Sequence, residues 1–118
     1  VSNLTMTGGI FYLMNHSVEI LPGNFTENIS GGTIRLPGNF IADAGVTSFH
    51  PTGGIVELYD DWDVDCGFLE ASCWFHDLFI TKSGGAGVVP FYGIRVKNHL
   101  KINEGYLQLY GNPVVVGP

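Results

Sequence analysis

The chain has little charge, and very little of that charge is positive. Only 14% of its 118 residues are charged, with five Lys+Arg against eleven Asp+Glu and a formal net charge of −6. Nucleic-acid binding depends on a basic surface that neutralises phosphates, so the sequence predicts no nucleic-acid partner. Disorder combines high charge with low hydrophobicity, whereas 45% of these residues are hydrophobic. The chain is therefore expected to fold.

Long apolar runs and cysteines are also scarce. No apolar stretch approaches the roughly 20 residues that cross a bilayer as a helix, so no membrane insertion is predicted. Cys66 and Cys73 are the only thiols, and nothing near them resembles a metal or nucleophile site. We interpret them as a disulfide that closes a short loop. The alternative is two free, buried thiols in a reducing compartment.

Glycine is abundant where charge is not. The chain holds 17 glycines and six prolines, and glycine destabilises helix interiors. No segment keeps a period of 3.6 over ten residues, whereas short segments alternate so that one apolar row points inward. The predicted strand segments are Val18–Ile20, Thr33–Leu36, Ile55–Leu58, Leu78–Thr81, Ile94–Val96, Leu100–Ile102 and Leu107–Leu109. The sequence therefore predicts an all-β fold.

Double-glycine turns recur at a nearly fixed interval. They are Thr7-Gly8-Gly9, Ser30-Gly31-Gly32 and Thr52-Gly53-Gly54, and each precedes an alternating apolar segment. Such periods are typical of stacked solenoid coils. We predict one module over residues 1–118, a parallel β-helix (β-solenoid) of about five coils. An antiparallel β-sandwich is the alternative fold, because short alternating strands occur in both.

A fourth double glycine, Ser83-Gly84-Gly85, follows after a distinctly longer interval. We interpret this interval as a coil that carries an insertion, and the insertion contains the two cysteines and the proposed disulfide.

The two ends of the chain resemble each other. Residues 9–22 align with residues 105–118, matching Leu13 with Leu109, Val18 with Val114 and Ile20 with Val116. Neither end carries a polar capping coil, which an isolated solenoid needs. We expect either one period of a longer tandem chain or separate copies stacked head to tail, an open contact that propagates into filaments. The candidate assembly residues are Val1, Leu4, Met6, Leu107, Leu109, Val114 and Val116.

The chain contains, in this order, the phrases SNLTMTGGIFYL, GNFTENISGGTIRLPGNF, PTGGIVEL, HDLFITKSGG and VKNHLKINEGYLQLYGN. Through these phrases, most of the chain resembles the tandem repeats of large secreted and cell-surface bacterial β-solenoid proteins. The resemblance implies a solenoid that acts as a stalk, adhesin or wall-associated polymer, in an extracellular or cell-surface location. The chain departs from those repeats at residues 59–75.

Four N-x-S/T sequons lie close together near the start of the sequence, at Asn3, Asn15, Asn24 and Asn28. Such sequons accept N-linked glycan on surface segments, so these four asparagines are candidate glycosylation sites. The alternative is that asparagine serves turn geometry and threonine serves strand propensity in a repeated phrase.

The one concentrated charge is the acidic run at residues 59–65. Asp61, Asp63 and Asp65 alternate, so on a strand they would share one face and form a weak Ca²⁺ candidate. The EF-hand pattern fails, because Cys66 and Ser72 stand where it requires Gly and Glu. A solvated acidic face is the favoured interpretation, and no metal or cofactor is predicted.

The sequence predicts a structural protein and no enzyme, since no basic residue lies near the acidic run before Lys82. The predicted partner is the chain itself, with covalent glycan as a second. An adhesive or carbohydrate-binding surface module, contacting its ligand through residues 59–75, is the alternative function.

Overall fold

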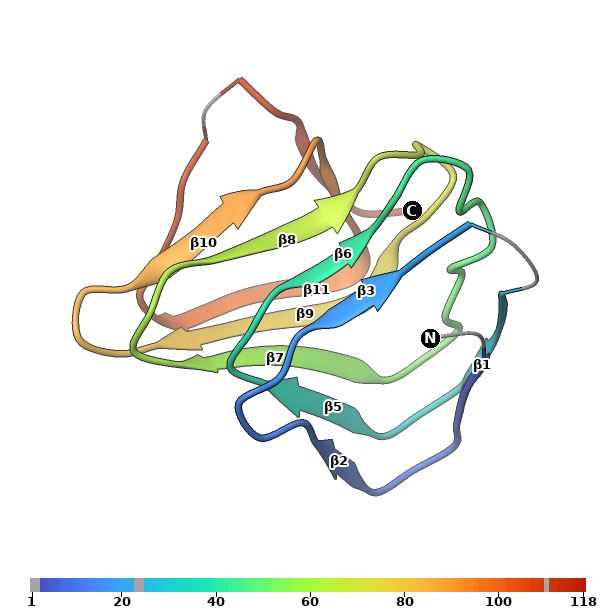
Figure 1. Cartoon of the computed structure of the whole chain (residues 1–118), viewed down its shortest axis with the longest axis horizontal. Helices are drawn as coiled ribbons and strands as arrows, with labels where there is room; N and C mark the ends of the chain where they lie inside the picture. Colours follow the sequence, from blue (N-terminus) through green and yellow to red (C-terminus); the bar gives the residue numbers. More distant parts are fainter. Residues whose placement is uncertain (1–2, 23–24, 110) are drawn as a thin grey trace.

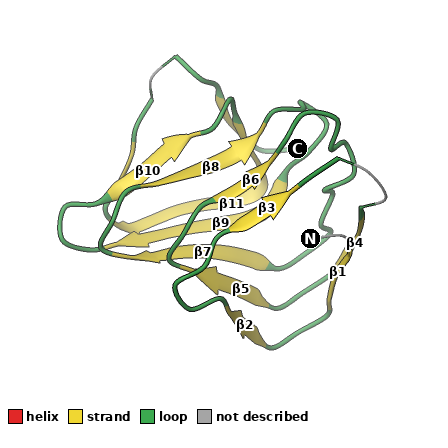
Figure 2. Cartoon of the chain, viewed as in Figure 1, coloured by secondary structure: helices red, strands yellow, loops and turns green. Residues whose placement is uncertain are grey.

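The chain winds as a solenoid of about five coils whose sides are stacked parallel sheets (Figures 1 and 2). The computed structural model describes residues 3–22, 25–109 and 111–118. The strands are β1 (Asn3–Met6), β2 (Ile10–Tyr12), β3 (Val18–Ile20), β4 (Thr26–Ile29), β5 (Thr33–Leu36), β6 (Phe40–Ala42), β7 (Ile55–Asp60), β8 (Val64–Phe68), β9 (Phe75–Lys82), β10 (Gly87–Pro90), β11 (Ile94–Glu104), β12 (Tyr106–Leu107) and β13 (Val114–Val116).

Three sheets form the sides of the solenoid. A six-stranded sheet has the order β13-β11-β9-β7-β5-β2, and a five-stranded sheet has the order β12-β10-β8-β6-β3. The third side carries only the pair β1-β4, at the right of Figure 2. Every strand pair in these sheets is parallel. The all-β solenoid prediction is confirmed, and the antiparallel sandwich is wrong.

The double glycines form one corner of the first three coils. The second glycine of each pair, Gly9, Gly32 and Gly54, has a φ of 77°, 87° and 88°, a region that residues with a Cβ avoid. The corners also stack, because Thr33 N donates to Gly9 O and Ile55 N donates to Gly32 O, each at 2.9 Å. The repeated phrase thus encodes a corner that turns the chain from the third side into the six-stranded sheet.

Two inward columns of the six-stranded sheet contribute six side chains to the core. Ile34, Val56 and Leu78 are in register and no more than 6% exposed. Leu36, Leu58 and Ile80 form a second column with no exposure at all. Burial of such side chains contributes about 1.5–3 kcal/mol each.

A cluster of phenylalanines forms another part of the core. Phe40, Phe49 and Phe75 are fully buried, and the Phe49 ring lies 5.4 Å from Phe40 and 5.5 Å from Phe68, measured between centroids. Phe49 belongs to residues 47–52, which run along the third side without strand assignment. Backbone bonds from Thr52 N to Ile29 O and from Trp74 N to Phe49 O hold this side in the coil stack.

The predicted long coil with an insertion is wrong. In the six-stranded sheet Thr33 pairs with Ile55 and Ile55 pairs with Asp77, so successive coils there have equal length. Gly84 and Gly85 form a different corner, where Ser83 N donates to Asp60 O at 2.9 Å.

The turns that join the six-stranded sheet to the five-stranded sheet differ in length. Leu36 and Phe40 are four positions apart in the sequence, whereas their partners in the next coil, Leu58 and Cys66, are eight positions apart. The acidic run therefore forms a turn that is four positions longer than the turn stacked on it.

The predicted match between the two chain ends is also wrong. Ile10–Tyr12 lies in the six-stranded sheet, whereas its aligned counterpart Tyr106–Leu107 lies in the five-stranded sheet. The pair Val18–Ile20 and Val114–Val116 is exchanged in the same way. The aligned segments share an alternating pattern, which is common to all sides of the solenoid and does not identify the side.

Candidate functional site

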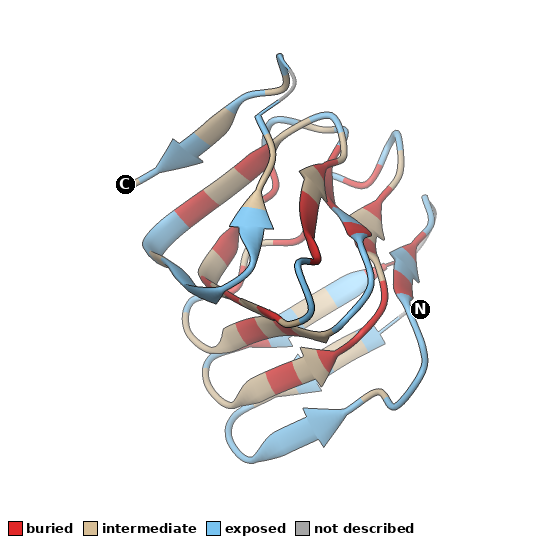
Figure 3. Cartoon of the chain, turned by 90° about the vertical axis from the view of Figure 1, so that its left-hand side faces the viewer, coloured by how far each residue is buried: buried red, intermediate tan, exposed pale blue. Residues whose placement is uncertain are grey.

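The two ends of the solenoid expose side chains that belong to the interior. Phe11 continues the inward column of Ile34, which is 2% exposed, yet Phe11 is 46% exposed. At the other end, Ile102 continues the column of Ile80, which is fully buried, and is also 46% exposed. Figure 3 shows β2, the first strand of the six-stranded sheet, at the bottom and pale blue (exposed) along its length. These side chains point inward but lack a neighbouring coil among the described residues.

The sheet edges at both ends offer unpaired backbone as well. Within the described residues, β1, β2 and β3 each pair with one neighbour only. At the opposite end, β13 pairs only with Ile94–Val96 of β11, so the remainder of β11, residues 97–104, pairs on one side. Unpaired backbone donors and acceptors of this kind are a template for another strand.

The predicted assembly residues are divided between the interior and the surface. Leu4, Met6, Leu107 and Val114 are partly buried against the core of their own chain. Leu109 and Val116 are 67% and 50% exposed. Val1 lies outside the described residues. Exposed end residues that were not predicted include Ile10, Phe11, Tyr12, Met14 and Ile102. The register of Phe11 and Ile102 against buried columns is the signal that would have found these two.

Two sequon asparagines lie together on the third side. Asn3 on β1 and Asn28 on β4 are exposed, and Asn3 Oδ1 accepts a hydrogen bond from the Thr26 hydroxyl. Asn15 is exposed in the turn after β2 and has a φ of 60°. Asn24 lies outside the described residues. Glycan acceptance at these asparagines stays a prediction, and the three described ones are exposed.

The predicted disulfide is wrong, because Cys66 and Cys73 are free and buried. Cys66 lies in β8, in register with Phe40 and Pro90 of the adjacent coils. Cys73 lies in the following corner, and its thiol donates to Val46 O at 3.0 Å. The two thiols thus lie among different neighbours, Cys66 within the sheet and Cys73 beside Val46 O. The alternative interpretation, two free buried thiols, describes the structure.

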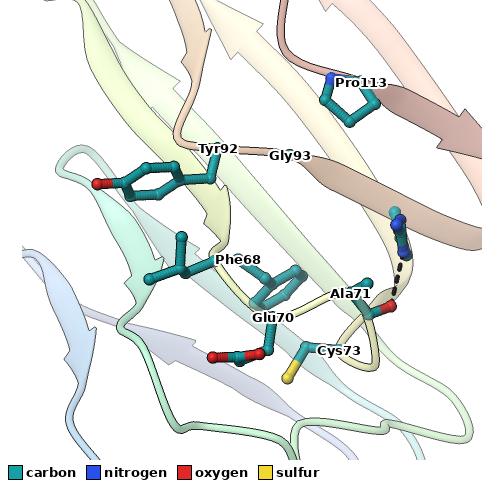
Figure 4. A pocket seen from close by; sticks show the side chains of 9 residues that line it. Phe68, Glu70, Ala71, Cys73, Tyr92, Gly93 and Pro113 are labelled. Carbon is teal, nitrogen blue, oxygen red and sulfur yellow. Dashed lines mark hydrogen bonds between the residues drawn. The ribbon is translucent and has the colours of Figure 1, made fainter.

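Burial also makes both thiols poor nucleophiles. Burial, with a smaller effect of the neighbouring Asp65 charge, raises the pKa of Cys66 far above its usual range. Burial likewise raises the pKa of Cys73. The hollow beside Cys73 (Figure 4), which Phe68, Glu70 and Tyr92 also line, has a volume of about 70 Å³, the space of about two waters.

The acidic run connects coils and does not gather its carboxylates. Asp63 Oδ1 accepts hydrogen bonds from Gly87 N at 2.9 Å and from the Tyr106 hydroxyl at 3.2 Å. Asp61 lies in the turn and Asp65 on β8. In the described part of the chain, no group of three His, Cys, Asp or Glu side chains is placed to hold a metal ion. The structure gives no support to the Ca²⁺ candidate.

Lys82 is a structural feature that the sequence did not reveal. Its side chain is fully buried, and Nζ donates to Tyr59 O at 2.6 Å and to Pro37 O at 2.8 Å. Burial lowers the pKa of Lys82, while Asp60, Asp63 and Asp61 partly restore it. The ammonium thus joins three successive coils at one corner, where carbonyl groups would otherwise lack a donor.

Comparisons with models of protein families, with curated proteins and with solved structures found no match to this chain. Nor do the described residues include a helix with the length and apolarity needed to cross a membrane. The geometry of the solenoid and the chemistry of its surfaces are therefore the basis for assigning a function.

Proposed function

We propose that this chain is a structural module of an extracellular filament or surface stalk, lengthened along the solenoid axis by further coils. The carrying observation is that two buried columns end in half-exposed apolar residues, Phe11 at one end and Ile102 at the other. No catalytic activity is part of the proposal.

The energetic case rests on what an added coil would bury. Covering a half-exposed Phe or Ile side chain recovers part of the roughly 1.5–3 kcal/mol that full burial contributes. A strand laid on residues 97–104 of β11 would also pair with its unpaired edge. Parallel pairing would align its alternate side chains with Leu100 and Ile102, extending the columns by one step.

The partner is a coil of the same architecture, supplied by another copy or by a tandem repeat. Only a segment with the same inward alternation continues both columns, because a one-residue shift turns the apolar set outward. The contact is heterologous, so it propagates and does not close into a dimer. An extended fibre is the natural product.

The sequons support a surface location in the same proposal. Asn3 and Asn28 are exposed on the outer face of the third side, whereas Leu4 and Met6, which alternate with Asn3 and Thr5 on β1, pack against the core. Glycan on this outer face would hinder lateral pairing and leave axial growth open. The alternative function, an adhesive contact through residues 59–75, has Trp62 and Leu69 as exposed large apolar side chains, at 43% and 36%.

The test measures self-association of the 118-residue chain by analytical ultracentrifugation and negative-stain electron microscopy. We expect concentration-dependent filaments, with a diffraction spacing near 4.8 Å along their axis. Phe11→Glu and Ile102→Glu should each raise the association midpoint at least tenfold. Trp62→Glu is the matched control, since it places the same charge on an exposed residue away from both edges.

Two results would overturn the proposal. One is a monomer at all concentrations up to the millimolar range. The other is association that Trp62→Glu weakens as much as the edge variants do, which would place the contact on the lengthened turn and favour the adhesive alternative.

A further inference from the structure

The basic residues of this acidic chain are not spread over its surface. Of the five Lys and Arg residues, Arg35 forms an ion pair with Glu57 at 2.8 Å and Lys82 is buried. The remaining three, Arg95, Lys97 and Lys101, all lie on β11. None of the three has a carboxylate partner within the described residues. The unpaired positive charge is therefore concentrated on one strand.

These three side chains share the outer face of the six-stranded sheet. Ile94 and Val96 are buried, so the alternating Arg95 and Lys97 face outward. After an irregularity between Val96 and His99, Lys101 pairs with the outward Phe79. The row spans about 20 Å at roughly 3.3 Å per residue. It forms an extended basic row, not a point charge.

Aromatic rings hold the cations in place. Lys97 Nζ lies 4.6 Å from the Trp74 ring centroid, and Lys101 Nζ lies 5.5 Å from that of Phe79. Arg95 Nε donates to Ala71 O at 2.7 Å, a bond drawn in Figure 4. Each such contact restricts the rotamers of the cationic side chain before a ligand binds, so less conformational entropy is lost on binding.

Two shallow hollows lie along the same row. One, of about 350 Å³, is lined by Trp74, Arg95, Lys97 and Val115 among others. The other, of about 360 Å³, is lined by Phe79, His99, Leu100 and Lys101. Both combine apolar surface with a cation. This suits a ligand with an apolar CH face and an anionic substituent.

We propose that the outer face of β9 and β11 binds an anionic polysaccharide, through Arg95, Lys97 and Lys101. Carboxylate or sulfate groups would accept hydrogen bonds from the three cations, while sugar CH groups would lie against Val115 and Phe79. The site does not depend on axial assembly, since an added coil pairs with the strand edge and leaves the outward side chains open.

Nucleic acid fits this face less well. Sequence-independent binding of single strands uses open aromatic faces on which bases stack. The Trp74 ring is stacked on His50 of the preceding coil at 4.5 Å and meets Lys97 of the following coil. Its faces are therefore occupied. Three cations on a chain of net charge −6 also neutralise few phosphates.

The test is affinity electrophoresis and titration calorimetry of the whole chain with four probes. Polygalacturonate and heparin separate carboxylate from sulfate recognition, dextran is the neutral control, and a single-stranded oligothymidylate tests nucleic acid. We expect binding to one or both anionic polysaccharides that weakens as salt rises, with no binding to dextran. The triple variant Arg95→Gln, Lys97→Gln, Lys101→Gln should bind at least tenfold more weakly.

A charge-matched control separates the site from net charge. Asn15→Asp, His16→Asp and Ala44→Asp lower the net charge by the same amount at exposed positions off β11 and should change affinity less than threefold. Circular dichroism and thermal unfolding verify that both triple variants fold. The proposal is overturned by no binding to either polyanion, by equal losses in the two triple variants, by binding to dextran, or by tighter binding of the oligonucleotide.

Discussion

Phe49→Ala is the most direct test of the core. Phe49 is fully buried and its ring lies 5.4–6.5 Å from those of Phe25, Phe40, Phe68 and Phe75, although its own segment is not a strand. Truncation removes the burial of the ring and leaves a cavity, which costs about 3–5 kcal/mol for a buried Phe. A chain of this length has a total stability of roughly 6–18 kcal/mol. The variant should therefore lose a large share of it.

Urea unfolding followed by tryptophan fluorescence measures this loss. With a slope near 2 kcal/mol per molar, a loss of about 4 kcal/mol lowers the midpoint by roughly 2 M. Phe11→Ala is the control, because Phe11 occupies the last position of a column and is already 46% exposed; its loss should stay below about 1.5 kcal/mol. If the two variants lose the same stability, the phenylalanine cluster is not the centre of the core.

Three further predictions concern the corners and the thiols. A Cβ on Gly53 would lie 2.2 Å from Ser30 O, whereas a Cβ on Gly8 meets nothing within 4 Å. Gly53→Ala should therefore lower the free energy of unfolding by about 1–3 kcal/mol, and Gly8→Ala by less than about 0.5 kcal/mol. Equal effects of the two substitutions in a thermal melt would refute the stacked corner. The folded protein should not react with a thiol reagent at neutral pH, whereas the protein unfolded without reductant should react at two thiols. A mass two daltons below that of the reduced chain, with no thiol that reacts after unfolding, would show that the disulfide forms. The raised pKa of Cys66 means that the native state keeps a proton that the unfolded chain releases near pH 8.5. This contribution to the stability of the folded state is therefore complete below about pH 8.5 and is lost as the pH rises. By pH 10 the free energy of unfolding is lower by about 2 kcal/mol. Denaturant midpoints of wild type and Cys66→Ala measured at pH 7 and pH 10 should show a smaller alkaline loss in the variant, and parallel losses would show that this thiol is not shielded.

The repeat period alone was enough to predict the fold class. In a solenoid each strand pairs with the strand one repeat earlier in the chain. The strand register can therefore be predicted from the spacing between similar segments of the sequence. The glycine pairs ending at Gly9, Gly32 and Gly54 and the columns of Ile34 and Leu36 follow that spacing. For this reason the all-β coil stack and several strand segments could be predicted from the amino-acid sequence. Two predicted segments, Ile94–Val96 and Leu100–Ile102, form the single strand β11. Both pair with β9, and the register is irregular between them.

What the sequence could not determine was the side of the solenoid on which each segment lies. That depends on the length of every corner. The acidic turn is four positions longer than the turn stacked on it, yet Ile55 pairs with Asp77 at the same spacing as Thr33 with Ile55, so the later part of that coil is correspondingly shorter. Stacking of the coils places Gly84 and Gly85 at another corner, where Ser83 N donates to Asp60 O, and directs the Cys73 thiol toward Val46 O. It also buries Lys82 beneath two earlier coils. The outward row of Arg95, Lys97 and Lys101 beside Trp74 and Phe79 has the same origin, because neighbours between coils are set by stacking and not by proximity in the chain.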